Sequence, residues 1–400
     1  MEAVSLLNEL DELTVNLGIS VVGREVIRIR KTSPRFILGK GKVNEILEAI
    51  NESNADVIIF DNEISPAQQR NWESISKVLV IDRHEIILDV FAERAQTKEA
   101  KLQVKLARLE YSLPRLRRAW THLGRQRGGG VNQKGEGEAQ IELDQRMVRD
   151  QISATRKEIA LVSRQRQTGR SRRQRLPLPS VAIVGYTNAG KSTLLNYLTG
   201  ANTVSEDKLF ATLDPTSRRL KLPKGRMIVL TDTVGFIRKL PHRLVDSFKA
   251  TLEEALVADL ILHMVDLSSS EFEAQMKTTQ QVLIELGASD TKLLTVYNKI
   301  DQINDDVEKI RAKRIAHQPV FISAQKGDGI PILLGKLEEI FSENKEKYCY
   351  IIPFNRYDLV ARLKALGELI EEETTEVGYR ITGTPQGDLH HTLEQFLEKG

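Results

Sequence analysis

The sequence is poor in cysteine, in aromatic residues and in long apolar runs. Cys349 is the only cysteine among 400 residues, which excludes an intrachain disulfide and a cysteine-cluster metal site and is typical of a reducing compartment. Charge interrupts every apolar stretch before it reaches the length of a membrane span. The N-terminus, MEAVSLLNELDEL, lacks the basic and then apolar pattern of a secretory signal. We therefore expect a cytoplasmic protein without a membrane span.

The excess of positive charge is confined to one part of the chain. The net charge is only +3, but residues 93–175 hold 21 Lys/Arg against 9 Asp/Glu, a net charge of +12. Residues 1–92 have a net charge of −5, and the remainder has −4. A basic block of this kind favours a polyanionic partner, and nucleic acid is the polyanion that we consider first. A solvated helical face with no partner is the alternative explanation.

Residues 1–92 are predicted to form a small α/β subdomain. The β-branched runs Val57–Phe60 and Val78–Asp82 are typical of buried parallel strands. Between them, Ser65 followed by Pro66 favours the start of a helix. The turn at residues 39–42 (GKGK) precedes another helix and can hold an anion there, although a plain basic turn would have the same sequence.

Residues 93–175 are predicted to form a basic helical hairpin. Two apolar series with steps of three and four flank a glycine-rich stretch at residues 124–137, and Pro114 predicts a break in the first helix. The stretch holds no aromatic residue, so we expect contacts with nucleic-acid phosphates rather than base stacking; a disordered tip without a partner is the alternative. The candidate RNA-binding residues are Arg125, Arg127, Gly128, Gly129, Gly130 and Lys134.

Residues 176–345 contain the strongest motif. A predicted strand, Val181–Val184, leads into residues 185–192 (GYTNAGKS) and then into a helix, which is the context that a phosphate-binding loop requires. Glycines let backbone N–H groups surround the phosphates, and the helix N-terminus adds positive potential. We expect Lys191 to reach the β- and γ-phosphates and the Ser192 hydroxyl to bind Mg²⁺. The expected nucleotide-binding residues of this loop are Gly185, Asn188, Ala189, Gly190, Lys191, Ser192 and Thr193.

Three further elements follow in the order found in GTPases, each at the end of a predicted strand. Asp232 opens the segment DTVG, where its carboxylate can hold Mg²⁺ and the Gly235 N–H can sense the γ-phosphate. Residues 298–301 (NKID) place Asp301 to pair with the two N–H donors of guanine, which adenine lacks, with Asn298 tying the loop together and Lys299 covering the base. Ser323 and Ala324 would bring a backbone N–H to the guanine oxygen. Ligands in open α/β sheets bind at such strand ends.

The sequence lacks one residue that many GTPases use for hydrolysis, the glutamine after the DTVG segment. We expect a switch threonine that binds Mg²⁺, with Thr212 the first choice and Thr216 the fallback, and we assign catalysis to Lys191, Thr212 and Gly235. The residue after Gly235 is Phe236, where many GTPases have a glutamine that orients the attacking water. Intrinsic hydrolysis should therefore be slow and completed by a partner, another residue or an ion. Asn188 either holds a monovalent cation beside the phosphates or only stabilises the loop.

Residues 346–400 are predicted to form a small α/β domain. The expected strands are Tyr348–Pro353 and Tyr379–Thr382, and the expected helical stretches are Asp358–Leu366 and His391–Leu397. The adjacent His390 and His391 suggest either a metal ligand pair or an ordinary helix start.

Across nearly its whole length the chain resembles the HflX family of translation-associated GTPases, relatives of the Obg group. The resemblance is carried by FILGKGKVNEI, DNEISPAQQRNW, WTHLGRQRGGG, GEGEAQIELDQR, GYTNAGKSTLLN, FATLDPT, DTVGFI and NKID. The family has proline and threonine where this chain has Glu136 and Ala139. The resemblance implies an N-terminal α/β HflX domain with a long helical hairpin, a Ras-like P-loop G domain and a small C-terminal α/β domain.

The resemblance also implies a function. It implies binding to ribosomes, mainly through the large subunit and its ribosomal RNA, and dissociation of stalled or idle ribosomes into subunits. It implies Mg²⁺ as cofactor and GTP as substrate, activation by the ribosome because a hydrophobic residue follows DTVG, and stimulation by K⁺ through the phosphate-loop asparagine. We expect the chain to act as a monomer.

Three other functions remain compatible with the sequence. One is a GTPase acting in ribosome assembly or on another structured RNA. A second is a non-catalytic RNA-binding module whose G domain only senses nucleotide. A third is an ATP-driven RNA remodeller that uses the turn at residues 39–42, although no second complete phosphate loop is present in the sequence.

Overall fold

The structure is a computed structural model of the chain. It describes residues 2–116, 133–173, 178–200, 209–210, 215–239, 257–288, 291–303, 306–342, 348–366, 369–385, 389 and 392–398. The contacts divide the chain into two compact units. Unit 1 comprises Met1–Ser163, Lys208–Leu213 and Arg238–Lys249, and unit 2 comprises Arg164–Asp207, Asp214–Ile237 and Ala250–Gly400.

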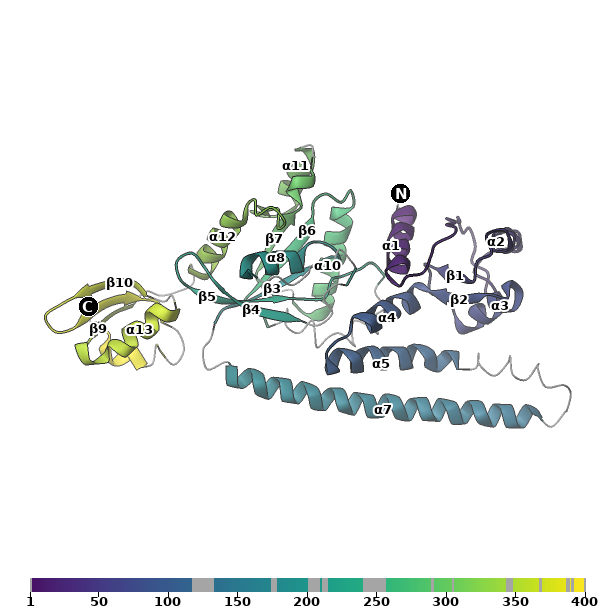
Figure 1. Cartoon of the computed structure of the whole chain (residues 1–400), viewed down its shortest axis with the longest axis horizontal. Coiled ribbons are helices and arrows are strands. Elements are labelled where there is room, and N and C mark those ends of the chain that lie inside the picture. The colour runs from purple at the N-terminus through teal and green to yellow at the C-terminus, as the bar shows by residue number, and fades with distance from the viewer. Residues whose placement is uncertain are drawn as a thin grey trace. The chain divides into compact units, whose positions relative to one another are not determined.

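Unit 1 begins with a small α/β fold (Figure 1). Its elements are α1 (Glu2–Asn16), α2 (Lys40–Ser53), β1 (Val57–Phe60), α3 (Pro66–Ser76), β2 (Leu79–Asp82) and α4 (Arg83–Arg94). The strands β1 and β2 pair in parallel, as predicted, and pack around Trp72, which is wholly buried. The predicted start of α3 is confirmed, because the Ser65 and Gln68 side chains form a reciprocal capping box with Pro66 in the first turn.

The carboxyl end of β2 is organised by a single buried carboxylate. Asp82 accepts hydrogen bonds from the N–H groups of His84 and Glu85 and so caps α4. It also accepts from the Tyr111 hydroxyl at 3.0 Å and pairs with Arg115 at 3.4 Å. Burial, reinforced by the Asp82 charge, raises the pKa of Tyr111 well above its usual range, so the phenol stays protonated and keeps donating. These bonds tie the sheet to the start of the hairpin.

The hairpin helices differ in part from the prediction. The first, α5 (Lys98–Ser112), ends in the short 3₁₀ turn η1 (Leu113–Arg115) around Pro114, so the predicted break is confirmed. The second, α7 (Gln133–Arg173), is one continuous helix that includes Gly135 and Gly137 (Figure 1). The predicted glycine-rich loop at residues 124–137 is therefore wrong from residue 133 onward. Each glycine costs a helix about 1 kcal/mol, which the many strong helix formers that follow can offset.

The predicted tip residues lie mostly outside the described part of the chain. This holds for Arg125, Arg127, Gly128, Gly129 and Gly130. Lys134 lies in the first turn of α7, and its side chain is outside the described set.

Unit 2 is built on a six-stranded sheet in the order β4-β5-β3-β6-β7-β8. All neighbouring strands are parallel except β4 and β5, which are antiparallel. The strands are β3 (Ser180–Gly185), β4 (Thr216–Lys221), β5 (Met227–Asp232), β6 (Leu260–Asp266), β7 (Leu293–Asn298) and β8 (Val320–Phe321). In the described part of unit 2, the helices and 3₁₀ turn between and after these strands are α8 (Lys191–Thr199), α10 (Phe272–Leu286), η2 (Ile300–Gln302), α11 (Val307–Ile315) and α12 (Ile330–Ser342).

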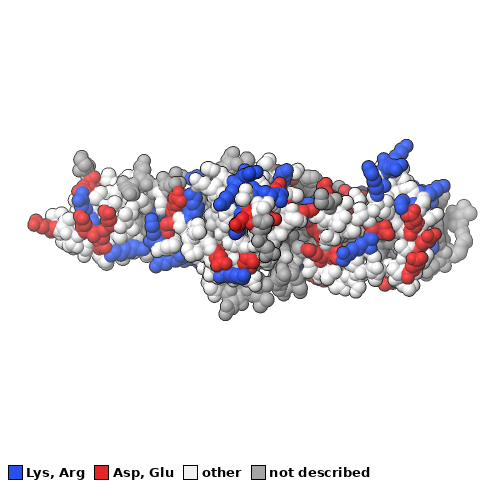
Figure 2. All heavy atoms as spheres, turned by 90° about the horizontal axis from the view of Figure 1, so that it is seen from above, with Lys and Arg blue, Asp and Glu red and all other residues white. Residues whose placement is uncertain are grey.

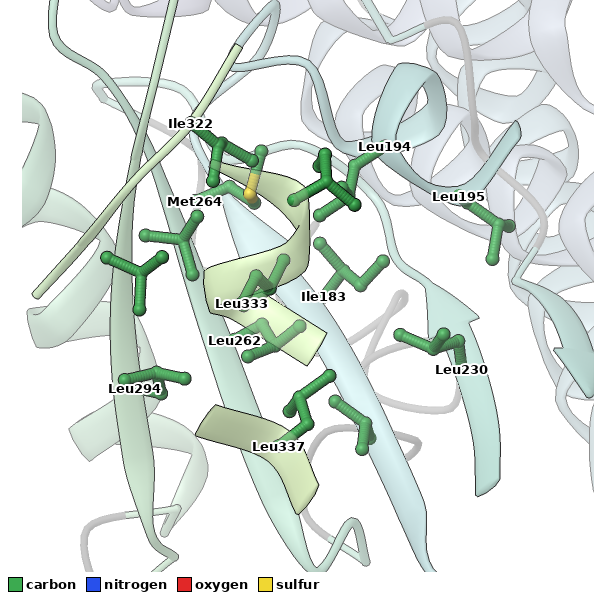
Figure 3. Close-up of a cluster of buried hydrophobic side chains, with 14 of the residues drawn as sticks. Ile183, Leu194, Leu195, Leu230, Leu262, Met264, Leu294, Ile322, Leu333 and Leu337 are labelled. Carbon is green, nitrogen blue, oxygen red and sulfur yellow. The ribbon is translucent and has the colours of Figure 1, made fainter. Parts of the chain in front are cut away.

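Helices cover both faces of this sheet, which explains why its parallel strands are almost continuously apolar. On one face, α8 and α12 contribute Leu194, Leu333 and Leu337 to a core with Ile183, Leu230 and Leu262 from the strands (Figure 3). On the other face, Phe272 and Met276 of α10 and Ala312 of α11 pack with Tyr297. A phosphate-loop α/β fold is thus observed, and the buried sheet presents its carboxyl-terminal strand ends at one edge.

The C-terminal residues form a separate three-stranded antiparallel sheet in the order β10-β11-β9. Its elements are β9 (Tyr348–Ile352), η3 (Phe354–Arg356), α13 (Tyr357–Leu366), β10 (Leu369–Thr374), β11 (Tyr379–Gly383) and η4 (Glu394–Phe396). The two predicted strands and the helix near 358–366 are confirmed. The acidic strand β10, with the sequence LIEEET, was not predicted, because strand propensity disfavours consecutive glutamates except at a solvated sheet edge. His390 and His391 lie outside the described residues.

The described helices and the surface charge match what the composition predicted: no membrane span, and charges of both signs. Within the described residues, no helix is long and apolar enough to cross a membrane. Figure 2 shows Lys/Arg and Asp/Glu side chains interspersed over the face that it draws, so neither sign of charge dominates there.

Candidate nucleotide site

The phosphate loop joins β3 to α8 and depends on two glycines. A Cβ at Gly185 would lie 2.2 Å from the Met264 carbonyl oxygen of the neighbouring strand β6, so only glycine permits that approach. Gly190 precedes α8 with a φ of +90°, and a Cβ there would lie 2.2 Å from the Asn298 amide nitrogen. The glycine spacing of the motif is therefore required by strand packing and by the base loop together.

Asn188 and Lys191 lie in the same loop with different environments. Asn188 is exposed in the left-handed region, with a φ of +60°, which asparagine tolerates better than most residues. Ala189 is buried beside it. Lys191 is buried, and its Nζ donates to the carbonyl oxygens of Gly185 at 3.2 Å and Tyr186 at 2.7 Å. Burial lowers the pKa of Lys191 to about 8, and the Asp232 charge acts in the opposite direction.

Two of the three predicted magnesium ligands, Ser192 and Asp232, are brought together across the sheet. The Ser192 hydroxyl, at the start of α8, donates to Asp232 Oδ2 at 2.6 Å, at the end of β5. One hydroxyl and one carboxylate form the hard oxygen donor set that Mg²⁺ prefers, so these residues fit the ion. Thr193 follows in the first turn of α8, and the free backbone N–H groups of a helix's first turn can bind an anion.

The DTVG segment lies directly against the phosphate loop. A Cβ at Gly235 would lie 2.9 Å from Thr187 Cα and 3.0 Å from Lys191 Nζ. The next residue, Phe236, pairs with the loop through its backbone: its N–H donates to the Gly185 carbonyl at 3.0 Å, and its carbonyl accepts from the Thr187 N–H at 2.8 Å. The glycine at position 235 is therefore required by close approach.

The base loop is connected to the phosphate loop through Asn298. Its amide nitrogen donates to the Ala189 carbonyl, and its amide oxygen accepts from the Ala324 N–H, both at 2.9 Å. Lys299, in the left-handed region, pairs with Asp266 at 2.8 Å. Ser323 is wholly buried and turns the loop that follows β8 by accepting from the Lys326 N–H.

Asp301, the predicted guanine-reading residue, lies in η2 with a largely buried carboxylate. It approaches the exposed Lys326 ammonium at 3.7 Å. Lys326 was not predicted from the sequence as a neighbour of Asp301, because only the fold brings the two loops together.

The first-choice switch residue, Thr212, lies outside the described residues, whereas the fallback Thr216 begins β4. Two residues upstream of Thr212, Phe210 is buried in unit 1 and packs edge-on against Phe91 of α4, with ring centroids 4.5 Å apart.

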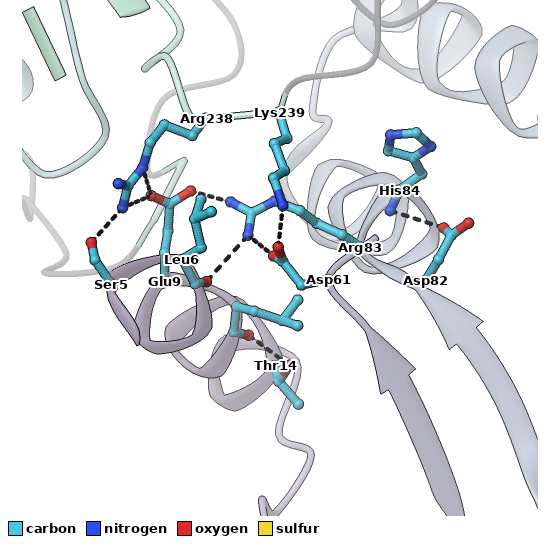
Figure 4. A network of polar contacts seen from close by, with 11 residues as sticks. Ser5, Leu6, Glu9, Thr14, Asp61, Asp82, Arg83, His84, Arg238 and Lys239 are labelled. Atoms are coloured by element: carbon cyan, nitrogen blue, oxygen red, sulfur yellow. Dashed lines mark hydrogen bonds and ion pairs between the residues drawn. The ribbon is translucent and has the colours of Figure 1, made fainter. Parts of the chain in front are cut away.

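Unit 1 contains a buried network of charged side chains around α1 (Figure 4). Arg83 pairs with Glu9 and, at 2.7 Å, with Asp61. Arg238 donates to Glu9 at 3.1 Å, and Lys239 pairs with Asp61. The residues that follow DTVGFI in the sequence are thus held by α1 and by the end of β1.

A basic groove of about 750 Å³ runs beside α5 and α7 in unit 1. Its lining includes the exposed basic residues Arg149, Arg156 and Lys157, with Arg156 paired to Glu110 at 2.6 Å. The sequence indicated the basic segment but not these residues, because the groove exists only where the two helices meet. Lys and Arg side chains along a groove can neutralise the phosphates of a nucleic acid.

Three family models match consecutive parts of the chain. The one described as the N-terminal part of a GTP-binding GTPase matches residues 5–92, and the one described as its middle region matches residues 94–173. The one described as a 50S ribosome-binding GTPase matches residues 180–299.

Individual relatives span nearly the whole chain. A protein named GTPase HflX from Akkermansia muciniphila is 44% identical and covers 99% of this chain and 93% of its own length. GTPase HflX from Escherichia coli is 42% identical, with 92% and 87% covered. Among solved structures, a GTP-binding protein from Sulfolobus solfataricus in complex with GDP is 26% identical, covers 85% of this chain and 96% of its own, and has a TM-score of 0.44.

Proposed function

The chain belongs to the HflX family of GTPases and hydrolyses GTP, and from that premise we propose that it is a ribosome-binding switch. In its GTP-bound form it would bind the large subunit and ribosomal RNA and promote the dissociation of stalled or idle ribosomes. GTP stabilises the form that binds the ribosome more tightly, and hydrolysis releases the protein, which is a shift of population between two states. The observation that carries the proposal is the match of residues 180–299 to a 50S ribosome-binding GTPase.

We assign the residues of the site as follows. Lys191 binds the β- and γ-phosphates, the Gly235 N–H senses the γ-phosphate, and Asp301 reads guanine. Ser192, Asp232 and Thr212 hold Mg²⁺, which when bound neutralises charge that develops on the phosphates. We propose that Asn188 holds K⁺. The proximity of Ser192 to Asp232 and of Gly235 to Lys191 supports these roles.

We divide the chain into four domains, at residues 1–92, 93–175, 176–345 and 346–400. The second of these, the basic hairpin, is proposed to contact RNA. Its net charge of +12 and the groove beside α7 support this assignment. Neutralising several phosphates gives binding that is strong at low salt and weakens steeply as salt rises.

The first test is GTP hydrolysis with and without purified large ribosomal subunits, in potassium and in sodium buffer. We expect the subunits to stimulate hydrolysis strongly, since Phe236 cannot orient water and the intrinsic reaction lacks a glutamine. Deletion of residues 124–137 should remove most of the stimulation while leaving GDP affinity unchanged. If the subunits stimulate hydrolysis in neither the potassium nor the sodium buffer, the proposal is contradicted.

Dissociation is tested separately, on mature ribosomes, by sedimentation of subunits after incubation with protein and GTP. Subunit release with GTP and not with GDP is the expected result. Stimulation by large subunits without release from mature ribosomes would instead favour a GTPase of ribosome assembly. A rise in rate in potassium alone, abolished in Asn188→Ala, would assign the cation site to Asn188.

A further inference from the structure

The residue after the DTVG motif has a buried side chain. Phe236 is 1% exposed, and both its backbone groups are bound to the phosphate loop, through Gly185 and Thr187. A buried phenyl ring held by two backbone hydrogen bonds can neither donate to a water molecule nor accept from it. The group that positions the attacking water must therefore come from a different residue.

Thr187, the third residue of the phosphate-loop motif, lies against the DTVG segment and carries a hydroxyl. Gly235 approaches it so closely that an added Cβ would lie 2.9 Å from both Thr187 Cα and Thr187 Cγ2 and 3.0 Å from Lys191 Nζ. Lys191 and the Gly235 N–H are the two groups assigned to the γ-phosphate. Thr187 thus lies where the γ-phosphate ligands converge.

The Thr187 hydroxyl has no hydrogen-bond partner among the described residues. The residue is 6% exposed, and Oγ1 is buried without a donor or acceptor from that part of the chain. Buried hydroxyls are normally paired, because an unpaired one loses its hydrogen bonds to water without replacement. The backbone N–H of the same residue is already used by Phe236, so the side chain is the part of Thr187 left to interact with a ligand.

We propose that Thr187 is a catalytic residue of GTP hydrolysis, whose hydroxyl positions the attacking water in place of the usual glutamine; this rests on the proposed nucleotide site. Oγ1 accepts a hydrogen bond from the water and donates its own proton in a hydrogen bond to a γ-phosphoryl oxygen. The water oxygen attacks the γ-phosphorus, and the bond to the β,γ-bridging oxygen breaks with its electron pair left on GDP. Both water protons leave with the released dihydrogen phosphate, so the threonine is neither consumed nor charged.

The test compares Thr187→Val, which keeps the shape but lacks the hydroxyl, with Thr187→Ser, which keeps the hydroxyl. Single-turnover hydrolysis of GTP is measured with protein in excess, together with the Kd of fluorescent GDP. We expect Thr187→Val to slow hydrolysis by at least about tenfold at unchanged GDP affinity, and Thr187→Ser to stay within about threefold of the original rate. Thr199→Val is the matched control, because that hydroxyl only donates to the Leu195 carbonyl within α8.

Three outcomes would overturn the proposal. They are a normal rate in Thr187→Val, an equal loss in Thr187→Ser, or a loss of rate matched by a loss of GDP affinity, which would indicate a structural role. If Thr187→Val does not bind GDP at all, Thr187→Ala replaces it in the comparison with Thr187→Ser. The same differences in hydrolysis rate and GDP affinity are then expected. The ratio of rates is taken without ribosomal subunits, so a failure of ribosome stimulation in the unmodified protein remains a separate result.

Discussion

Asn298 shows how one amide can join the two halves of a nucleotide site. Its nitrogen and its oxygen are both used, by the phosphate loop at Ala189 and by the loop at Ala324, and the residue is 3% exposed. Because a buried amide that loses one partner keeps the cost of desolvation, the two loops are constrained to move together. The site is therefore positioned by the sheet edge and not by either loop alone.

Asp301 is expected to set the preference for guanine. Asp301→Asn replaces an acceptor-only carboxylate with an amide that faces the guanine N–H donors with its own N–H group. We expect at least about a hundredfold weaker GDP binding and a gain in affinity for xanthosine diphosphate, whose extra carbonyl can accept from the amide. Titration with fluorescent nucleotides measures both, with Asp306→Asn, an exposed residue paired to Lys309, as control. Unchanged guanine selectivity would show that the base loop is wrongly assigned.

His263 of β6 should make stability sensitive to acid. Burial lowers its pKa to about 4 from an unfolded value near 6.5, so between these values the unfolded chain binds more protons. The free energy of unfolding is therefore unaffected by His263 above about pH 6.5. As pH falls from 6.5 toward 4, His263 lowers the free energy of unfolding by at most about 3 kcal/mol. Thermal unfolding followed by circular dichroism at pH 7 and pH 5 measures it.

The variant His263→Leu should lose less stability between those two pH values than the unmodified protein, while the exposed His317→Leu should behave as the unmodified protein does. An identical acid response in all three proteins would show that another group controls it.

At the scale of elements, α1, β1 and α4 are joined by one arginine. Arg83 is 1% exposed and pairs with Glu9 and Asp61, so its removal leaves two carboxylates in a poorly solvated place without that partner (Figure 4). Arg238 and Lys239 still pair with these two carboxylates, so we expect Arg83→Met to destabilise unit 1 by about 3 kcal/mol, the lower end of the cost of breaking a buried ion pair. Urea unfolding followed by tryptophan fluorescence is suitable, because Trp72 and Trp120 both belong to unit 1.

Arg108→Met serves as the comparison, because Arg108 pairs with Asp89 at the surface, where both side chains are more than 40% exposed. Its effect should stay below about 1 kcal/mol. Equal effects of the two substitutions would contradict the role given to the buried network.

At the scale of the whole molecule, the basic segment should act through charge and salt. The double change Arg149→Glu and Lys157→Glu alters two exposed residues of the groove beside α7. We expect weaker binding to large subunits and a plot of log affinity against log salt whose slope is shallower by about one for each phosphate that is no longer neutralised. Co-sedimentation over a series of salt concentrations gives both values.

The control is Lys277→Glu with Arg314→Glu, which makes the same change of net charge on exposed positions of α10 and α11. If both double variants weaken binding equally, the effect is one of overall charge and the groove does not bind the subunit.

Much of the fold followed from local rules. Strands such as Val57–Phe60 and Val181–Val184 are β-branched runs next to turn residues, and Pro66 and Pro114 act on the backbone through their own rings, so neighbours in sequence determine them. The prediction of a loop at Gly135 and Gly137 was wrong, because the stability of a long helix outweighs the cost of single glycines. The strand at 369–374 was missed because its glutamates are tolerated only at a solvated edge.

The sequence by itself determined the family, the order of the nucleotide motifs and the residue types proposed to bind phosphate and guanine, because those chemistries need particular side chains at particular spacings. Tertiary structure alone decided which side chains meet. It placed Lys326 beside Asp301, brought Thr187 against Gly235 and buried its hydroxyl, and formed the groove of α5 and α7. The physical reason is that contacts between residues far apart in the chain depend on strand order and packing, which no local spacing encodes.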